Sequence, residues 1–264
     1  MFIARLKNSN DLKNLFDAVN SVLTEVNILI DSDGIRIDAL GSMRVAMISL
    51  QIKREDFEIF ELPEEDASYT IGINTTDLLK ILKRGSASDH IMLEYTDEKS
   101  YLYVVIESAD QQKNKRFSLS TISLDDEAPP IDQLNQIEFS NIIRLNCDEI
   151  EEALNDALIY TDAINVQIDS QEKEIHFSTE GSIGDLKSVL KEEEFEIIEM
   201  NTDCRVVFTI AKFKNIMKIS TLSDSFEFSI ENEKPAKLFF DLFSSSSATY
   251  FIAPRVESDT DEYS

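Results

Sequence analysis

Residue types that could carry out catalysis are present, but they are not spaced for it. The two histidines, His90 and His176, lie far apart in the sequence and do not form a pair of metal ligands. Neither Cys147 nor Cys204 has a neighbouring base, and the chain has no glycine-rich loop of the kind that holds phosphate. The sequence therefore predicts no catalytic residue, no metal site and no cofactor.

Clusters of carboxylates support one alternative, in which the protein is an enzyme. The run Asp125–Glu127 could hold a metal, and Asp31 with Asp33 could do acid–base work, as in a carboxylate-dependent metal hydrolase. The chain has 51 acidic residues, however, so such clusters are expected by chance. The segment 31–34 also begins like a calcium loop, but Gly34 comes too early and no glutamate closes the spacing, which favours a turn.

Basic residues gather on two stretches with helical periodicity. In 75–84, Lys80, Lys83 and Arg84 lie on the face opposite the apolar residues, and 211–220 carries Lys212, Lys214 and Lys218 without an acid. One such face is usually only a solvated surface. A net charge of −26 argues against a nucleic-acid partner only if it is evenly spread, because phosphate contacts need Lys and Arg. Two matching basic helices therefore make the distribution of charge more informative than its total.

An internal repeat decides the architecture that must position these helices. The segment 26–32, VNILIDS, recurs at 164–170 as INVQIDS. Each copy follows an amphipathic helix with matching apolar positions, which are Leu12, Phe16 and Val19 in the first and Ile150, Leu154 and Ala157 in the second. Each half is therefore predicted to run helix, strands, helix, strands.

The stretch from Ser120 to Gln136 separates the two copies and is predicted to be a linker. Adjacent Pro129 and Pro130 fix φ and remove backbone donors, so we expect neither a helix nor a central strand there. The predicted organisation is a domain at 1–120, a linker at 121–136, a second domain at 137–257 and a disordered acidic tail at 258–264.

Each domain is predicted to be mostly antiparallel sheet with two helices on one face, which is an α+β fold. The helices are expected at 8–22, 75–84, 148–161 and 211–220, and three follow an Asn-x-x-acid signal resembling a capping box, at Asn8, Asn74 and Asn146. In the first half, strands are expected at 26–30, 35–39, 43–52, 69–73, 91–95, 101–108 and 116–120. In the second half, one is expected at 138–145 and more strands follow the helix 148–161 as far as 176. The remaining strands are expected at 185–190, 195–200, 205–210, 225–230, 236–242 and 249–253. The acidic stretch 56–66 is expected to be a loop.

Composition is consistent with two ordinary cores. The 264 residues are 42% hydrophobic, and no apolar run reaches membrane-spanning length. The opening MFIARLKNSND has no apolar signal region, and two cysteines give no disulfide framework, so a reducing compartment is expected.

The opening MFIARL, the segment IGINTTDLLKILKR, the pattern STLSD, the acidic and proline-containing linker and the final YFIAPRVE together resemble the proliferating-cell-nuclear-antigen sliding clamps, particularly archaeal ones. The resemblance covers essentially the whole chain, with the motifs in the right order. It implies the DNA clamp fold, a ring of three subunits whose helices line a channel around duplex DNA, and a role as a DNA polymerase processivity factor without chemistry of its own. A cytoplasmic, nucleoid-associated location follows for an archaeal protein, and a nuclear one for a eukaryotic protein.

The resemblance also implies which residues contact DNA. Lys13, Lys80, Lys83 and Lys218 fall on the family's basic channel positions, and Arg84, Lys212 and Lys214 are additions. One helix departs from the pattern, because 148–161 carries five acids and no Lys or Arg, with Glu151 opposite Lys13 in the repeat. Acids in a first turn favour the helix dipole, but this does not explain Glu151. A heterotrimeric or checkpoint-type clamp subunit is therefore the near alternative.

In this family, DNA polymerase, the clamp loader, flap endonuclease and DNA ligase dock through short peptides that enter an apolar pocket beneath the linker. The matching positions are Leu40, Val45, Leu124, Ile131, Pro235, Phe251, Ala253 and Pro254. Phe251 stands where the family often has tyrosine, so a hydroxyl contact to the peptide is expected to be missing.

The resemblance finally places the subunit interface on two edge strands, 116–120 and 185–190. An open strand edge is normally paired or covered, and head-to-tail pairing of these two edges would close a ring. The residues concerned are Arg116, Phe117, Ser118, Leu119, Asp185, Leu186, Lys187 and Leu190, with Phe117 and Leu119 expected to add apolar contact across the joint.

Overall fold

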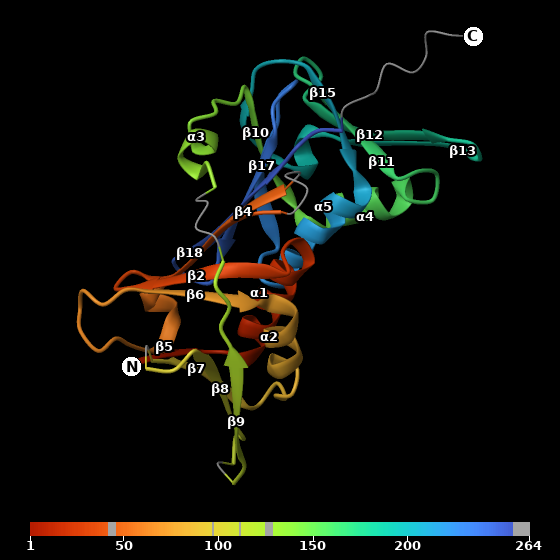
Figure 1. Cartoon of the computed structure of the whole chain (residues 1–264). Coiled ribbons are helices and arrows are strands. Elements are labelled where there is room, and N and C mark those ends of the chain that lie inside the picture. Colours follow the sequence, from red (N-terminus) through yellow and green to blue (C-terminus); the bar gives the residue numbers. More distant parts are fainter. Residues whose placement is uncertain (42–45, 97, 111, 125–128, 256–264) are drawn as a thin grey trace. The chain divides into compact units, whose positions relative to one another are not determined.

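The computed structural model describes residues 1–41, 46–96, 98–110, 112–124 and 129–255 (Figure 1). These residues form two compact units. Unit 1 contains Met1–Gln136, Lys218–Ser223 and Phe239–Tyr250, and unit 2 contains Ile137–Met217, Asp224–Leu238 and the segment that begins at Phe251. The predicted linker groups with unit 1, and the predicted tail at 258–264 lies outside the described residues.

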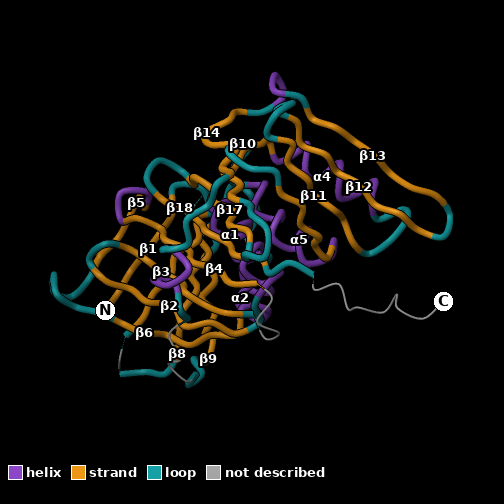
Figure 2. Tube along the Cα trace, turned by 90° about the horizontal axis from the view of Figure 1, so that it is seen from above, coloured by secondary structure: helices purple, strands orange, loops and turns teal. Residues whose placement is uncertain are grey.

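In unit 1, antiparallel strands run side by side in two sets (Figure 2). The first set has the order β5-β1-β7-β8-β9, with β1 at Phe2–Leu6, β5 at Phe57–Glu61, β7 at His90–Tyr95, β8 at Tyr101–Glu107 and β9 at Asn114–Ser120. The second has the order β4-β3-β2-β6, with β2 at Glu25–Asp31, β3 at Gly34–Leu40, β4 at Ala46–Lys53 and β6 at Tyr69–Asn74. Helices α1 (Ser9–Val22) and α2 (Thr75–Leu82) pack against each other and against these strands.

Unit 2 follows the same plan. One set of strands has the order β14-β10-β16, with β10 at Asn141–Asn146, β14 at Glu196–Met200 and β16 at Ser225–Ser229. The other has the order β13-β12-β11-β15, with β11 at Ala163–Asp169, β12 at Glu174–Gly181, β13 at Gly184–Leu190 and β15 at Cys204–Thr209. Helices α4 (Cys147–Ala157) and α5 (Ile210–Met217) pack together, and the chain closes with β17 (Ala236–Leu242) and β18 (Ser246–Ile252).

The order of elements confirms the internal repeat. From β1 to β9 the chain passes through α1 after the first strand and α2 after the sixth, and from β10 to β18 it passes through α4 and α5 at the same places. Even the single 3-10 turns before β5 and β14, Arg54–Asp56 and Glu192–Glu194, recur. The predicted α+β fold of two similar halves, with antiparallel sheets and helices on one face, is therefore confirmed.

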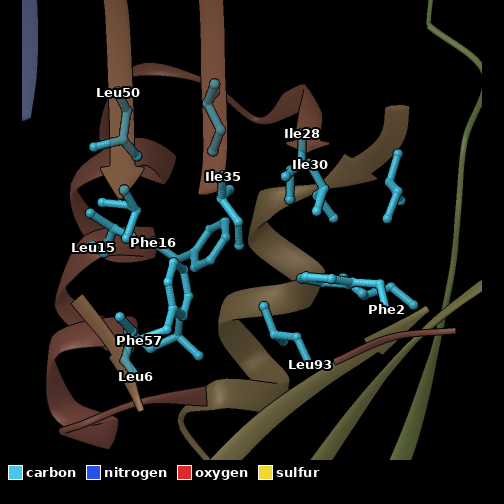
Figure 3. Close-up of a pocket in the computed structure, with 15 residues that line it drawn as sticks. Phe2, Leu6, Leu15, Phe16, Ile28, Ile30, Ile35, Leu50, Phe57 and Leu93 are labelled. Carbon is cyan, nitrogen blue, oxygen red and sulfur yellow. The ribbon is translucent and has the colours of Figure 1, made fainter. Parts of the chain in front are cut away.

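Alternating apolar residues build a separate core in each unit. In unit 2, Phe208, Phe213, Phe226 and Phe228 are fully or almost fully buried and their rings pack against one another. Burying a side chain of this size contributes roughly 1.5–3 kcal/mol. The core of unit 1 contains a small cavity lined entirely by apolar side chains, among them Phe2, Phe16 and Phe57 (Figure 3). Because this lining has no polar group, it offers nothing to orient a polar ligand.

The three asparagines predicted to start helices all occupy the N-cap position. The Asn8 side chain accepts a hydrogen bond from the Asn10 N–H at 2.9 Å, and the Asn74 side chain accepts one from Asp77 N–H at 3.0 Å. Asn146 makes no such bond. An N-cap side chain of this kind is worth about 0.5–2 kcal/mol, so the sequence signal located the helix starts for a physical reason at two of them.

Three local predictions were wrong. Residues 57–61 form β5 rather than a loop, because Phe57 and Phe60 are buried between exposed acids and the strand pairs with β1. Inside the predicted linker, Ile131–Asn135 forms a short helix, α3, directly after Pro130, where a proline suits the start of a helix. Helix α4 ends at Ala157 rather than at 161, because the next residues form tighter turns in which the Ile159 N–H donates to the Asp156 carbonyl and the Tyr160 N–H to the Ala157 carbonyl.

A buried carboxylate fastens two distant segments of unit 1. Asp56 is 4% exposed and accepts hydrogen bonds from the backbone N–H groups of Ser244 and Ser245, each at 3.1 Å, and from Ser246 Oγ at 2.5 Å. Burial alone would raise the pKa of Asp56, but the bonds from Ser246 and from the backbone outweigh it and hold the pKa below its usual value of 3.8.

Asp56→Asn should lower the free energy of unfolding by about 1–3 kcal/mol at neutral pH, because an amide cannot accept all of these bonds. Since the pKa of the folded carboxyl is depressed, its contribution is present above the unfolded pKa and is lost as the pH falls through the folded one. Chemical denaturation at several pH values measures this, with exposed Asp66→Asn as the matched control. Equal unfolding midpoints for Asp56→Asn and the unmodified protein at pH 7 would contradict the assignment.

Candidate nucleic-acid interface

Helix α2 presents its cations to solvent, as its periodicity predicts. Leu78, Leu79 and Leu82 are buried, whereas Lys80, Lys83 and Arg84 are exposed. Lys80 pairs with Asp77 at 2.8 Å, and Lys83 pairs with Asp17 of α1 at 3.0 Å. Exposed ion pairs of this kind are worth only about 0–1 kcal/mol, so both lysines can exchange their carboxylate for a phosphate at little cost.

Lys13, on α1, is less exposed than the lysines of α2. Its side chain is half-buried, and its Nζ donates a hydrogen bond to the Gly85 carbonyl at 3.0 Å, just beyond the end of α2. The predicted basic residues of unit 1 therefore sit on, or directly beside, one pair of packed helices. This places them within a common surface rather than scattering them over the unit.

In unit 2 the basic residues belong to α5 and its continuation. Lys212 and Lys214 are half-buried, and the Lys214 ammonium donates to the Asn155 side chain of α4 at 2.6 Å. Lys218 is exposed at the start of the 3-10 turn Lys218–Thr221, a segment that groups with unit 1. Each half thus carries cations on or after its second helix, and the first half has Lys13 on its first helix as well.

Helix α4 contributes the opposite charge. Glu151 is the fifth residue of α4, as Lys13 is the fifth of α1, so the alignment of the two holds in the folded chain. Asp148 and Glu149 lie in the first turn, where carboxylates interact favourably with the helix dipole. Glu151 is half-buried and Glu152 exposed, so the surface of α4 is acidic where that of α1 has a lysine.

The residues predicted to bind partner peptides belong to both units. In unit 1, Leu40 ends β3 with 36% of its surface exposed, and Leu124 and Ile131 are half-buried in the linker, while Val45 lies outside the described residues. In unit 2, Pro235, Ala253 and Pro254 are half-buried and Phe251 is 3% exposed. Apolar surface thus remains accessible at most of these positions.

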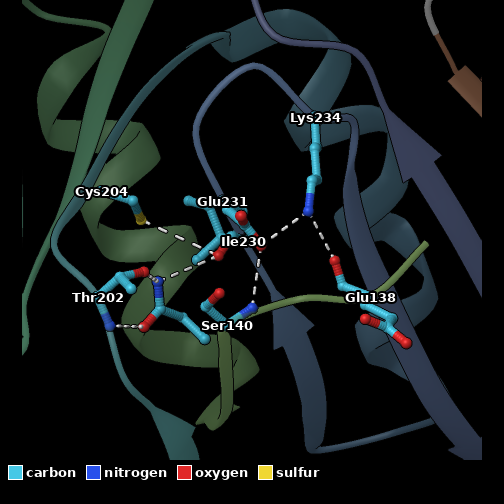
Figure 4. Close-up of polar contacts among 8 residues, drawn as sticks. Glu138, Ser140, Thr202, Cys204, Ile230, Glu231 and Lys234 are labelled. Atoms are coloured by element: carbon cyan, nitrogen blue, oxygen red, sulfur yellow. Dashed lines mark hydrogen bonds and ion pairs between the residues drawn. The ribbon is translucent and has the colours of Figure 1, made fainter.

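A polar network that sequence reasoning missed fixes the loop before Pro235 (Figure 4). The Lys234 ammonium donates to the Glu138 carbonyl at 2.9 Å and pairs with Glu231 at 3.0 Å, while the Ser140 N–H donates to the same Glu231 carboxylate at 3.0 Å. The hydrogen bond from Lys234 and then that from Ser140 hold the pKa of Glu231 below its usual range. Glu138 and Ser140 lie more than 90 residues before Lys234 and Glu231, so no local pattern could have revealed these two contacts.

Strands β9 and β13 each end a sheet order among the described strands. Beside β9, Ser108 N–H donates to Lys113 O and Thr121 N–H to Ser100 O, so in the alternating antiparallel pattern the Ser118 N–H points away from β8. The two-residue loop between Gly181 and Gly184 closes the β12–β13 hairpin, and the same alternation directs the Lys187 N–H outward. Both edges therefore present free ladder positions.

Two apolar residues of these strands face inward. Leu119 is 8% exposed and Leu190 is 6% exposed, so each belongs to the core of its own unit. The expectation that Leu119 adds apolar contact across a subunit joint stays a prediction, although little of the Leu119 side chain is exposed for it. Phe117 is only half-buried and keeps surface for such a contact, while Arg116 lies over the Tyr103 ring at 4.1 Å and pairs with Glu94 at 2.6 Å.

Of the groups considered for catalysis, Asp31 stabilises a turn and both cysteine thiols are buried. The Asp33 N–H donates to Asp31 Oδ1 at 2.9 Å, which is the geometry of a turn, and Asp125–Glu127 lies outside the described residues. Burial, and then Glu151 and other nearby acids, raise the pKa of Cys147 to about 12, and burial raises that of Cys204 to about 11. Both thiols therefore stay protonated. Within the described ranges, no three His, Cys, Asp or Glu side chains gather as a metal site.

Comparison with known proteins defines the family. Residues 1–128 match the family model of the N-terminal domain of proliferating cell nuclear antigen, and residues 133–255 match that of its C-terminal domain. The chain therefore belongs to the proliferating cell nuclear antigen family.

Individual relatives match over nearly the whole length. The chain is 28% identical over 262 residues to a DNA polymerase sliding clamp of Methanobrevibacter smithii, which covers 98% of this chain and 100% of that protein. It is 26% identical over 260 residues to a DNA polymerase sliding clamp of Methanothermobacter thermautotrophicus, with the same coverage. It is 25% identical over 267 residues to a proliferating cell nuclear antigen of Chaetomium thermophilum, again covering 98% and 100%. The resemblance to archaeal clamps is thus confirmed.

No helix in the described part of the chain combines the length and the apolar character needed to cross a membrane.

Proposed function

We propose that this chain is the subunit of a DNA polymerase sliding clamp, a closed ring that encircles duplex DNA and tethers replication and repair enzymes to it. The observation that carries the proposal is the internal repeat. The first half matches the N-terminal domain of the family and the second half its C-terminal domain, and each half has a pair of helices with lysines. The role is mechanical and involves no catalysis.

Electrostatics explain how such a ring would hold DNA without reading its sequence. Lysines of the helices would meet phosphates, which carry no base information, so the contact is the same at every position along the duplex. The weak pairs of Lys80 and Lys83 with acids favour contacts that form and break readily. The remaining surface of a protein with a net charge of −26 repels other nucleic acid. Enclosure, rather than affinity, then keeps the clamp on DNA.

Closure of the ring would use the two open strand edges. Pairing β9 of one subunit with β13 of the next is a head-to-tail contact, which closes when the rotation between subunits permits it. We propose a homotrimer. The acidic Glu151 at the position of Lys13 favours, as a second candidate, a heterotrimeric ring whose other members supply the missing charge. A monomeric mass for the chain purified alone would favour this second candidate.

Partner enzymes would dock through short peptides whose aliphatic and aromatic side chains enter an apolar pocket. The proposed pocket residues are the family-matched positions predicted from the sequence, which are Leu40, Val45, Leu124, Ile131, Pro235, Phe251, Ala253 and Pro254. DNA polymerase, clamp loader, flap endonuclease and DNA ligase are the proposed partners. The network of Lys234 and Glu231 would hold Pro235 in place.

Proline at either open edge should open the ring. Ser118→Pro and Lys187→Pro each remove an outward N–H, so the joint loses a ladder bond while the pairing inside the unit is kept. Light scattering should show a loss of the oligomeric mass, and circular dichroism an unchanged fold. Ser118→Ala and Lys187→Ala keep the N–H and should keep the mass. If both proline variants retained the mass of the unmodified protein, the interface would lie on other strands.

Removing the proposed channel lysines should flatten the salt dependence of DNA association. The slope of log K against log salt falls by about 0.9 for each phosphate that the protein no longer neutralises, so changing Lys80, Lys83, Lys214 and Lys218 to alanine should reduce it by roughly 3–4. Fluorescence anisotropy with a duplex at several salt concentrations measures it. A control with four exposed lysines away from the helices, Lys99, Lys113, Lys173 and Lys191, changed to alanine has the same net charge. Equal slopes in the two variants would contradict the assignment.

A charge in the proposed pocket should abolish peptide binding. Burying an unpaired carboxylate costs several kcal/mol, and a micromolar contact has only about 8 kcal/mol to lose. Calorimetry with a peptide carrying aliphatic and aromatic anchors should detect no binding to Leu40→Glu or Ala253→Glu. Leu158→Glu, at a residue 49% exposed on unit 2 outside the pocket, should bind normally. Full affinity in both pocket variants would rule the pocket out.

A further inference from the structure

A polar hollow of about 380 Å³ lies on unit 2, on one face of the sheet β13-β12-β11-β15. Asn165, Ser178 and Lys187 stand in one register row across β11, β12 and β13, and all three line the hollow. Their neighbours along the strands, such as Val166 and Phe177, are buried on the opposite face. Because α4 packs against these strands, the hollow opens on the face away from the helices.

One arginine in the hollow is held in a fixed orientation. Arg205 Nε donates to Asn165 Oδ1 at 3.0 Å, and Asn165 Nδ2 in turn donates to Ser178 Oγ at 2.8 Å. This chain of bonds satisfies Asn165 and leaves the terminal N–H groups of the Arg205 guanidinium available. Ser178 accepts its bond from Asn165, so its own O–H remains a donor. The side chains are thus arranged to donate hydrogen bonds to something that accepts them.

The lining has a small excess of positive charge, with Lys187, Arg205 and Arg255 against Asp162 and Glu180, although the chain as a whole is strongly acidic. Arg255 also lines the hollow. Its backbone N–H donates a hydrogen bond to the Val207 carbonyl at 2.7 Å, and its guanidinium pairs with Asp162 at 2.7 Å. Arg205 and Lys187 line the hollow without an ion pair to any described carboxylate, although Glu180 belongs to the same lining.

We propose that this hollow binds a phosphoryl group, carried by a free phosphate or by a small phosphorylated molecule such as a nucleotide. A tetrahedral dianion accepts hydrogen bonds in several directions, which suits an arginine, a lysine and a serine hydroxyl spread around a cavity. A single carboxylate is planar and would engage the Arg205 fork alone. The site is independent of the proposed DNA contact, because the duplex phosphates would meet the helices on the opposite face of the sheet.

The role of β13 as an open edge does not conflict with this site. Edge hydrogen bonds lie in the plane of the sheet, whereas the Lys187 side chain stands on its face and lines the hollow. The same residue can therefore offer its N–H to a neighbouring strand and its ammonium to an anion.

The test is a thermal-unfolding titration of the full chain with inorganic phosphate at constant ionic strength, since a ligand that binds the folded state raises the melting temperature with concentration. Arg205→Gln should weaken the apparent phosphate affinity about tenfold or more, the usual effect of losing a charge-assisted hydrogen bond. Asn165→Ala, which frees Arg205 to reorient, should weaken it less. Lys173→Gln, which removes a lysine outside the lining, is the matched control and should titrate as the unmodified protein does.

Parallel titrations with a nucleoside monophosphate and with acetate identify the source of the anion. Tighter binding of the nucleotide than of phosphate would support a nucleotide ligand, and equal binding would support free phosphate. The proposal is overturned if the unmodified protein shows no response to phosphate, if Arg205→Gln responds as the unmodified protein does, or if acetate matches phosphate.

Discussion

Backbone hydrogen bonds left open at β9 and β13 are the constraint on which the proposed assembly depends. In the sheet β5-β1-β7-β8-β9, the three inner strands β1, β7 and β8 each pair with a strand on both sides. The inner strands β12 and β11 of unit 2 do the same. An open edge is a template for pairing with another chain, and proteins normally cover or interrupt it. On β9, the Arg116 side chain pairs with Glu94 and lies over the Tyr103 ring.

The second constraint is that one chain must bind DNA while carrying a net charge of −26. The fold meets it by segregating charge, with lysines on or after α2 and α5 and Lys13 on α1. Helix α4 breaks this pattern, since Glu151 stands where α1 has Lys13. Nothing in the packing of α4 requires an acid at that position. In the proposed ring, this helix would weaken DNA contact locally and favour sliding over tight binding.

Periodicity and local capping signals predicted the large features of the fold. The repeat, both helix pairs and most strands follow from apolar spacing, and Asn8 and Asn74 mark helix starts because their side chains bond the first turn. The miss at β5 arose because its acids suggested a loop, although Phe57 and Phe60 alternate as a buried strand requires. The proline pair predicts no helix, yet Pro130 directly precedes α3.

Contacts between distant segments could not be predicted from the sequence. Asp56 with Ser246, Lys234 with the Glu138 carbonyl and Arg205 with Asn165 join residues that only the fold brings together. Resemblance to a family indicated the candidate lysines and pocket residues, because lone lysines and apolar residues carry no signal of their own. It also suggested Leu119 as a joint residue, although most of the Leu119 side chain is buried in unit 1.

Topological enclosure of DNA is the central claim, and retention on circular against linear duplex tests it most directly. The protein is assembled on a nicked circular plasmid with a clamp loader and washed at a salt concentration that removes electrostatic binding. The account predicts that it stays on the circle and is lost when a restriction enzyme linearises the plasmid. Equal retention on circular and linear DNA would contradict it, because binding would then depend on charge rather than on a closed ring.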